Sequence, residues 1–148
     1  MKLEQEFAVA VVVTYNPEPE RFNALLSAAL PQVERVIMVD NGSKPANLEW
    51  IRELVVHGRV ELIELGANLG IAAAQNVGIQ RVRDLGAPYV LLFDHDSIPE
   101  ASMVQTLMDV LQDKLRQGVR VAAVGPRYFD ERQNNPPPFI EVKGLRVI

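Results

Sequence analysis

The sequence predicts a doubly wound α/β fold, a mostly parallel β-sheet with helices on both faces. Apolar segments rich in β-branched residues alternate with amphipathic segments of helical length. The first apolar segment, residues 8–13, is apolar at every position, which is typical of a central strand covered on both faces. Strands that alternate with helices favour a parallel sheet, because each crossover returns the chain right-handed to the same sheet.

Five strands are expected, at residues 8–13, 35–39, 60–65, 89–93 and 121–124. The first helix begins at Pro19 and carries apolar residues at helical spacing from Phe22 to Leu30. Later helices are expected at 48–57, at 71–85 and from near Pro99 to Gly118. Residues 134–138 predict a loop, and residues 140–148 a hairpin. We therefore expect one domain over residues 1–130, and over 131–148 a loop and the start of a further, incomplete region.

Composition narrows the classes of function. The chain has 148 residues, enough for one ordinary domain. It carries 15 basic and 19 acidic residues, a formal charge of -4, so it has no overall attraction for nucleic acid. The absence of cysteine excludes disulfides, thiolate zinc sites and thiol nucleophiles. No apolar run approaches the roughly 20 residues of a membrane helix, and the start is not a signal peptide. The expected location is the cytoplasm, or the inner face of the membrane as a peripheral protein.

The predicted strands end in polar residues. Ligands of open parallel sheets lie at the carboxyl ends of the strands, so these residues are the candidates for a binding site. They are Thr14, Tyr15, Asn16, Asp40, Asn41, Asn68, Asp94, His95 and Asp96.

The sharpest of these patterns is Asp94-His95-Asp96, which directly follows an apolar strand. In an extended segment the two acids would point to the same side, about 6.6–7 Å apart. One could bind Mg²⁺ or Mn²⁺, which prefer oxygen ligands, and the other a ribose hydroxyl. His95 would point away, as a supporting or merely exposed group. Alternatively, both acids only cap the helix expected near Pro99.

Three further features have two interpretations each. Asp40 can accept hydrogen bonds from a nucleotide, or it can belong to a tight turn that Ser43 caps. Tyr15 can stack on a base or cover the sheet edge. The small residues after Gly70, with Asn68 and Gln75, suit a neutral polar ligand such as a sugar, or else tight helix packing. Their spacing is neither the dinucleotide-binding nor the P-loop pattern.

Four motifs, in order and spacing, resemble family 2 glycosyltransferases of the GT-A fold. They are Val12-Val13-Thr14-Tyr15-Asn16, Val39-Asp40-Asn41-Gly42-Ser43, the segment from Asn68 to Gly78, and Phe93-Asp94-His95-Asp96-Ser97. The resemblance covers about residues 8–130. It is strongest to bacterial rhamnosyltransferases, which usually carry Gln where this chain has His95.

The resemblance implies transfer of a sugar with inversion from a nucleoside diphosphate donor. The expected donor is dTDP-L-rhamnose, with a UDP-sugar as the alternative. The acceptor would be a hydroxyl of a growing bacterial polysaccharide or a lipid-linked glycan. Matching positions imply that Tyr15 and Asp40 contact the base, Asp94 the ribose or sugar, and Asp96 the Mg²⁺ or Mn²⁺ ion. The whole expected donor site comprises Thr14, Tyr15, Asn16, Asp40, Asn41, Asn68, Gly70, Gln75, Asp94 and His95.

Members of that family are about twice as long as this chain. The base that activates the acceptor is therefore expected beyond Ile148, and the chain by itself is expected to bind the donor with little transfer. Loss of a second half would expose apolar surface, so we expect a homodimer or aggregates.

Two other classes of function fit less well. A haloacid-dehalogenase-like phosphotransferase places its two acids after the first core strand, whereas here they follow the fourth. A receiver-like signalling module needs acids after its first strand, where this chain has Thr14-Tyr15-Asn16.

Overall fold

The computed structural model describes residues 7–126, and within them the predicted parallel sheet is confirmed. Four strands pair in the order β3-β2-β1-β4, all parallel. They are β1 (Ala8–Thr14), β2 (Arg35–Asp40), β3 (Val60–Glu64) and β4 (Tyr89–Asp94). Every residue of β1 is buried, as its uninterrupted apolar sequence predicts.

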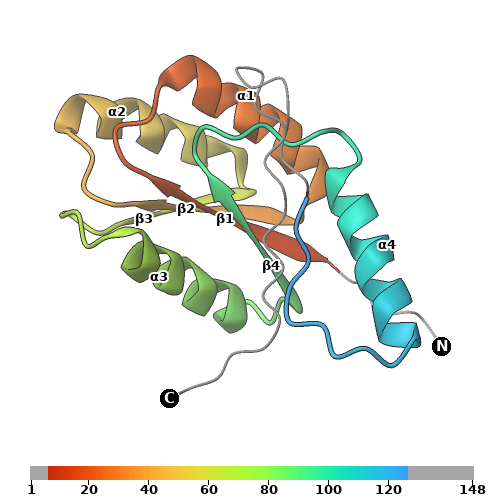
Figure 1. Cartoon of the computed structure of the whole chain (residues 1–148). Coiled ribbons are helices and arrows are strands. Elements are labelled where there is room, and N and C mark those ends of the chain that lie inside the picture. Colours follow the sequence, from red (N-terminus) through yellow and green to blue (C-terminus); the bar gives the residue numbers. More distant parts are fainter. Residues whose placement is uncertain (1–6, 127–148) are drawn as a thin grey trace, which may run out of the picture. The chain divides into compact units, whose positions relative to one another are not determined.

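Helices cover both faces of this sheet (Figure 1). The covering helices are α1 (Pro19–Ala29), α2 (Pro45–Glu53) and α3 (Ile71–Asp84). The structure also contains helix α4 (Met103–Arg116) and the short 3₁₀ turns η1 (Leu30–Gln32) and η2 (Leu54–His57). Helices α1 and α2 lie on one face and α3 on the other (Figure 1). Prolines at the starts of α1 and α2 suit the first turn, which has no partner for a backbone N–H.

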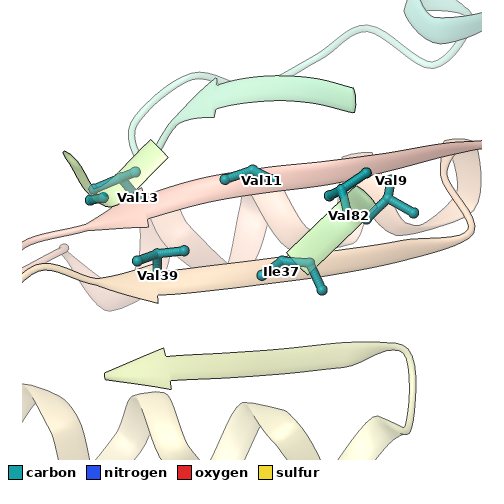
Figure 2. Packing of buried hydrophobic residues seen from close by; sticks show 7 residues of the cluster. Val9, Val11, Val13, Ile37, Val39 and Val82 are labelled. Carbon is teal, nitrogen blue, oxygen red and sulfur yellow. The ribbon is translucent and has the colours of Figure 1, made fainter. Parts of the chain in front are cut away.

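The core between α3 and the sheet consists of aliphatic side chains, most of them valines. Val82 of α3 lies against residues of β1 and β2 (Figure 2). Ala74 belongs to the same buried stripe of α3. Gly78 occupies the middle of that stripe. A Cβ there would collide with Cγ1 of Val11 and lie 3.2 Å from Cγ2 of Val39. Glycine therefore lets α3 approach the sheet closely.

Two expectations about the second half of the chain are wrong. Residues 121–124 are described and form no strand. Helix α4 begins at Met103 rather than near Pro99, so an irregular segment of eight residues, 95–102, follows β4. Pro99 itself is buried in that segment.

The chain divides into two compact units, Met1–Thr106 and Leu107–Ile148. The sheet and its three covering helices belong to the first unit. The predicted boundary near residue 130 and the predicted hairpin at 140–148 lie outside the described residues. None of the helices in the described part has the length and apolar character of a membrane span.

Candidate functional site

The carboxyl ends of β1, β2 and β4 meet at one edge of the sheet. Thr14 is paired with Asp40, and Val13 with Asp94. The polar residues that follow these strands are therefore brought to a common edge, as the parallel topology predicts. What each side chain does there differs from residue to residue.

Asp40 is buried and bonded entirely within the chain. Only 1% of it is exposed. Its Oδ1 accepts hydrogen bonds from Thr14 Oγ1 at 3.0 Å and Ser43 Oγ at 2.5 Å. Its Oδ2 accepts from the backbone N–H groups of Gly42 at 3.1 Å and Ser43 at 2.9 Å. An ionised carboxylate accepts about four hydrogen bonds, so this one is saturated. Contact of Asp40 with a nucleotide base stays a prediction.

Asn16 joins the end of β1 to the start of α2. Its φ of 47° is left-handed, a conformation that Asn adopts more readily than most residues. Its Oδ1 accepts hydrogen bonds from Lys44 N at 2.8 Å and Asn47 Nδ2 at 3.0 Å. Its backbone N–H donates to Ser43 Oγ at 2.8 Å. Both the side chain and the backbone of Asn16 thus hold the turn after β2.

Asn41 and Asn68 attach the loop after β3 to the same turn. Asn41 Nδ2 donates to Asn68 Oδ1 at 3.0 Å, and Leu69 N donates to Asn41 Oδ1 at 2.8 Å. Gly42 has a φ of +87°, and a Cβ there would lie 2.6 Å from the carbonyl carbon of Ala67. Only glycine fits, because both the backbone conformation and the approach of the loop exclude a side chain.

These bonds form a network that we call the edge network. Its members are polar side chains from the ends of three strands and from the start of α2, and they are Thr14, Asn16, Asp40, Asn41, Ser43, Asn47 and Asn68. Among the described residues, every buried side-chain nitrogen or oxygen has a hydrogen-bond partner. In this structure the network is thus a scaffold that fixes the edge, and ligand contacts by its members remain predictions.

Sequence reasoning did not identify Asn47 as part of this site. It identified Ser43 only as the cap of a turn. The Asp-Asn-Gly-Ser turn contains a signal for Ser43, because a hydroxyl three residues after an aspartate can reach its carboxylate. Nothing comparable marks Asn47, whose partner Asn16 lies 31 residues earlier.

Tyr15, Asp94 and Asp96 are exposed side chains of the edge that do not belong to the edge network, whereas Asn68 is exposed within the network. Tyr15 is 46% exposed, although Thr14 before it is fully buried. Asp94 and Asp96 are also exposed, and His95 is partly buried. The edge network fixes the backbone on both sides of Tyr15, so its ring is presented to solvent from a rigid base.

The segment Asp94-His95-Asp96 forms a turn, which corrects the expected extended geometry. Strand β4 ends at Asp94, and Ser97 N donates back to Asp94 O at 3.3 Å. The spacing of an extended strand therefore does not apply to the two carboxylates. We call residues 94–97 the acidic turn.

His95 ties the acidic turn to β1. Its Nδ1 lies 3.3 Å from the carbonyl oxygen of Val13. A carbonyl only accepts hydrogen bonds, so this contact assigns the proton to Nδ1. His95 is thus not merely exposed, and it has the expected supporting role, because it anchors the turn that carries Asp94 and Asp96.

Gly70 and Gln75 lie at the start of α3, close to the edge network. Gly70 precedes the helix with a φ of +87°, and its N–H donates to Asn68 Oδ1 at 3.0 Å. No atom lies within 4 Å of where its Cβ would be, so the positive φ is what requires glycine here. Gln75 is half-buried in the second turn of α3.

An ion pair lies at the end of β3. Arg52 of α2 donates two hydrogen bonds of 2.7 Å to the carboxylate of Glu64. These bonds lower the pKa of Glu64, since they stabilise its charged form, and they raise the pKa of Arg52. Both side chains are substantially exposed, so the pair is a modest surface interaction.

The carboxylate oxygens of the acidic turn are suitable ligands for a divalent cation. Asp94 and Asp96 are exposed carboxylates, the hard oxygen ligands that Mg²⁺ and Mn²⁺ prefer. Within residues 7–126, no group of three or more acidic, histidine or cysteine side chains could enclose an ion. The acidic turn therefore suits a cation that is bound by one or two carboxylates and has substrate phosphates as further ligands.

The model of the family described as glycosyl transferase family 2 matches residues 9–146 of this chain. The chain belongs to that family. Glycosyltransferases of this kind typically use divalent metal ions, in agreement with the ligand chemistry of the acidic turn.

Two curated rhamnosyltransferases are similar to this chain in sequence. A dTDP-rhamnosyl transferase, RfbF of Shigella flexneri, is 34% identical over 139 residues, which are 93% of this chain and 44% of the relative. An N-acetylglucosaminyl-diphospho-decaprenol L-rhamnosyltransferase of Mycobacterium tuberculosis is 33% identical over 126 residues, 81% of this chain and 40% of the relative. The chain therefore spans less than half the length of these relatives. They support neither a phosphotransferase nor a receiver module.

Solved structures confirm the fold. S. aureus TarS (residues 1–349) superimposes with a TM-score of 0.56 at 21% identity, over 84% of this chain and 40% of that one. The same part of TarS in complex with UDP gives a TM-score of 0.53 at 22% identity, again over 84% of this chain and 40% of that one. At this level of identity the likeness concerns the fold alone.

Proposed function

We propose that this chain is the donor-binding part of an inverting glycosyltransferase that transfers L-rhamnose from dTDP-rhamnose to a hydroxyl of a bacterial glycan. The proposal is carried by the acidic turn, whose exposed acids lie at the carboxyl edge of the sheet in a chain 34% identical to a dTDP-rhamnosyl transferase. The matched part of each curated relative is less than half of it, so acceptor binding and the catalytic base are assigned to no described residue.

The exposed side chains of Tyr15, Asp94 and Asp96 each contact a different part of the donor or its metal ion. Tyr15 stacks on the base, an interaction worth roughly 1–3 kcal/mol by analogy with single-stranded nucleic acids. Asp94 accepts hydrogen bonds from the ribose or the sugar, and Asp96 binds Mg²⁺ or Mn²⁺. When bound, the cation supplies Lewis-acid stabilisation of the charge on the leaving diphosphate. The edge network and His95 keep these groups in fixed positions, which reduces the ordering cost of binding.

Calorimetric titration with dTDP and with UDP, each with and without Mn²⁺, tests this assignment. We expect dTDP to bind more tightly than UDP, and Mn²⁺ to tighten both. Asp96→Asn should abolish the effect of Mn²⁺, with about a ten-fold loss of affinity in its presence. Asp94→Asn should weaken binding with and without the metal, because its proposed contact is with the sugar or ribose.

Glu100→Gln is the matched control, since it removes an exposed carboxyl of the same segment. It should bind as the wild type does. If Asp96→Asn retains the full response to Mn²⁺, the metal role of Asp96 is wrong. If the wild type binds neither nucleotide, the donor-binding function itself is wrong.

A further inference from the structure

The side chain of Gln32 joins three segments that lie far apart in the sequence. Its Nε2 donates to Ala28 O at 2.9 Å and to Glu100 O at 2.8 Å. Its Oε1 accepts from Val104 N at 3.1 Å. The amide thus uses its nitrogen and its oxygen to connect the end of α1 with the segment after β4 and the first turn of α4.

That segment, residues 95–102, includes most of the acidic turn, leads to α4 and contains neither helix nor strand. Its trace leaves β4 and reaches the start of α4 near the C-terminal end of α1 (Figure 1). One end is held by His95 at Val13 O and by the Ser97 to Asp94 turn. At the other end both Glu100 O and Val104 N bond to Gln32. These hydrogen bonds hold the two ends of the segment, which has no strand pairing, and the buried Pro99 lies between them.

Asp96 is four residues from the anchored carbonyl of Glu100. Four residues span at most about 14 Å, so an anchor at Glu100 restricts the positions available to Asp96. Releasing it would leave the carboxylate free to sample more positions, and ordering it on a ligand would then cost more free energy.

We propose that Gln32 is a positioning residue for Asp96, which it keeps in place for the metal-bound diphosphate by fixing the far end of segment 95–102. The inference rests on the proposed function, because that function makes Asp96 the metal ligand. The inference differs from the proposed function because it assigns a role to a residue that touches neither nucleotide nor metal.

Gln32→Met tests the proposal, because Met has a similar length and makes none of the three hydrogen bonds. Gln32→Glu is the second variant, which keeps an acceptor for Val104 N but places a carboxylate oxygen against two carbonyls. Amide hydrogen exchange should become faster in residues 97–104 of both variants. The Mn²⁺-dependent tightening of dTDP should fall about five- to ten-fold, as expected when one or both of the hydrogen bonds to Glu100 O and Val104 N are lost, while affinity without metal stays unchanged.

Arg59→Met is the matched control, since Arg59 holds the same turn between α1 and β2 from another side. Its guanidinium donates to Leu30 O at 2.8 Å, to Glu34 O at 3.1 Å and to Val33 O. This variant should lower the unfolding temperature and leave the response to Mn²⁺ intact, because none of these bonds involves residues 95–104.

Two results would overturn the inference. One is faster exchange at 97–104 in Gln32→Met with an undiminished Mn²⁺ response, which would make Gln32 a structural residue only. The other is an equal loss of that response in Arg59→Met, which general destabilisation would explain. A wild type without any Mn²⁺ response would instead refute the proposed function, so the two failures are distinguishable.

Discussion

Asp40 illustrates how a residue that is suited to binding a ligand can have all its hydrogen bonds within the protein. Its sequence position, at the end of a buried strand, fits a contact with a base. Its geometry shows a carboxylate with four donors around it and 1% of its surface exposed. Hydrogen bonds to a charged group are stronger than neutral ones, so this carboxylate fixes the turn after β2 firmly.

Asp40→Asn should therefore destabilise the protein whether or not a ligand is present. The amide would place an N–H group against donors from Gly42, Ser43 or Thr14. We expect the free energy of unfolding to fall by at least about 2 kcal/mol, measured by urea denaturation. Ser43→Ala, which removes one of the four donors, should cost less. An unchanged stability combined with weaker dTDP binding would favour the direct contact with a base instead.

At the scale of elements, the packing of α3 on the sheet depends on one position. The buried stripe of this helix consists of Ala74, Gly78 and Val82. Gly78 allows the helix backbone to approach Val11 and Val39 more closely than any side chain would permit. The same helix begins at the edge network, so its position also determines where Gly70 and Gln75 lie.

Gly78→Ala should destabilise the protein, although alanine is normally the better helix former. The added methyl group collides with Val11, whose β-branched side chain has few alternative rotamers. Overpacking of this kind costs about 1–3 kcal/mol in the free energy of unfolding. Val11→Ala should recover part of that loss in the double variant, a non-additivity that denaturation curves of all four proteins would reveal. A stable Gly78→Ala single variant would contradict the close approach.

At the scale of the whole molecule, the ion pair between Arg52 and Glu64 links global stability to pH. Hydrogen bonds from Arg52 lower the pKa of Glu64 below its ordinary value of 4.5. The pair therefore stabilises the folded state above that pH, and the contribution is lost as the pH falls through the lowered pKa of the folded state. Exposure makes this contribution small.

As the pH is lowered from about 5 to about 2, the stability of the Glu64→Gln variant should fall less than that of the wild type, because the variant has no carboxylate to protonate at this position. Unfolding temperatures measured across that range would show the difference. Glu53→Gln, which removes an exposed carboxyl at the end of α2, is the control for the change in charge. Identical acid dependence in the wild type and Glu64→Gln would show that the pair contributes nothing.

Much of the fold follows from the sequence because periodicity is a local property. The apolar run at residues 8–13 identifies the central strand, and the apolar stripe from Phe22 to Leu30 identifies α1. The helix expected at 71–85 agrees with α3 to within one residue. Parallel order follows from the alternation of strands and helices. The strand expected at 121–124 is absent, because an apolar segment of four residues does not by itself specify a pairing partner.

The sequence by itself determined that this protein has a parallel α/β sheet, that polar residues gather at its carboxyl edge, and that its motifs are those of its family. Only the tertiary structure decided which of those residues are bonded within the edge network and which lie exposed outside it. It also brought Gln32 to Glu100, 68 residues away. The physical reason is that hydrogen-bond saturation depends on partners from other strands and loops, which no spacing along one segment can specify.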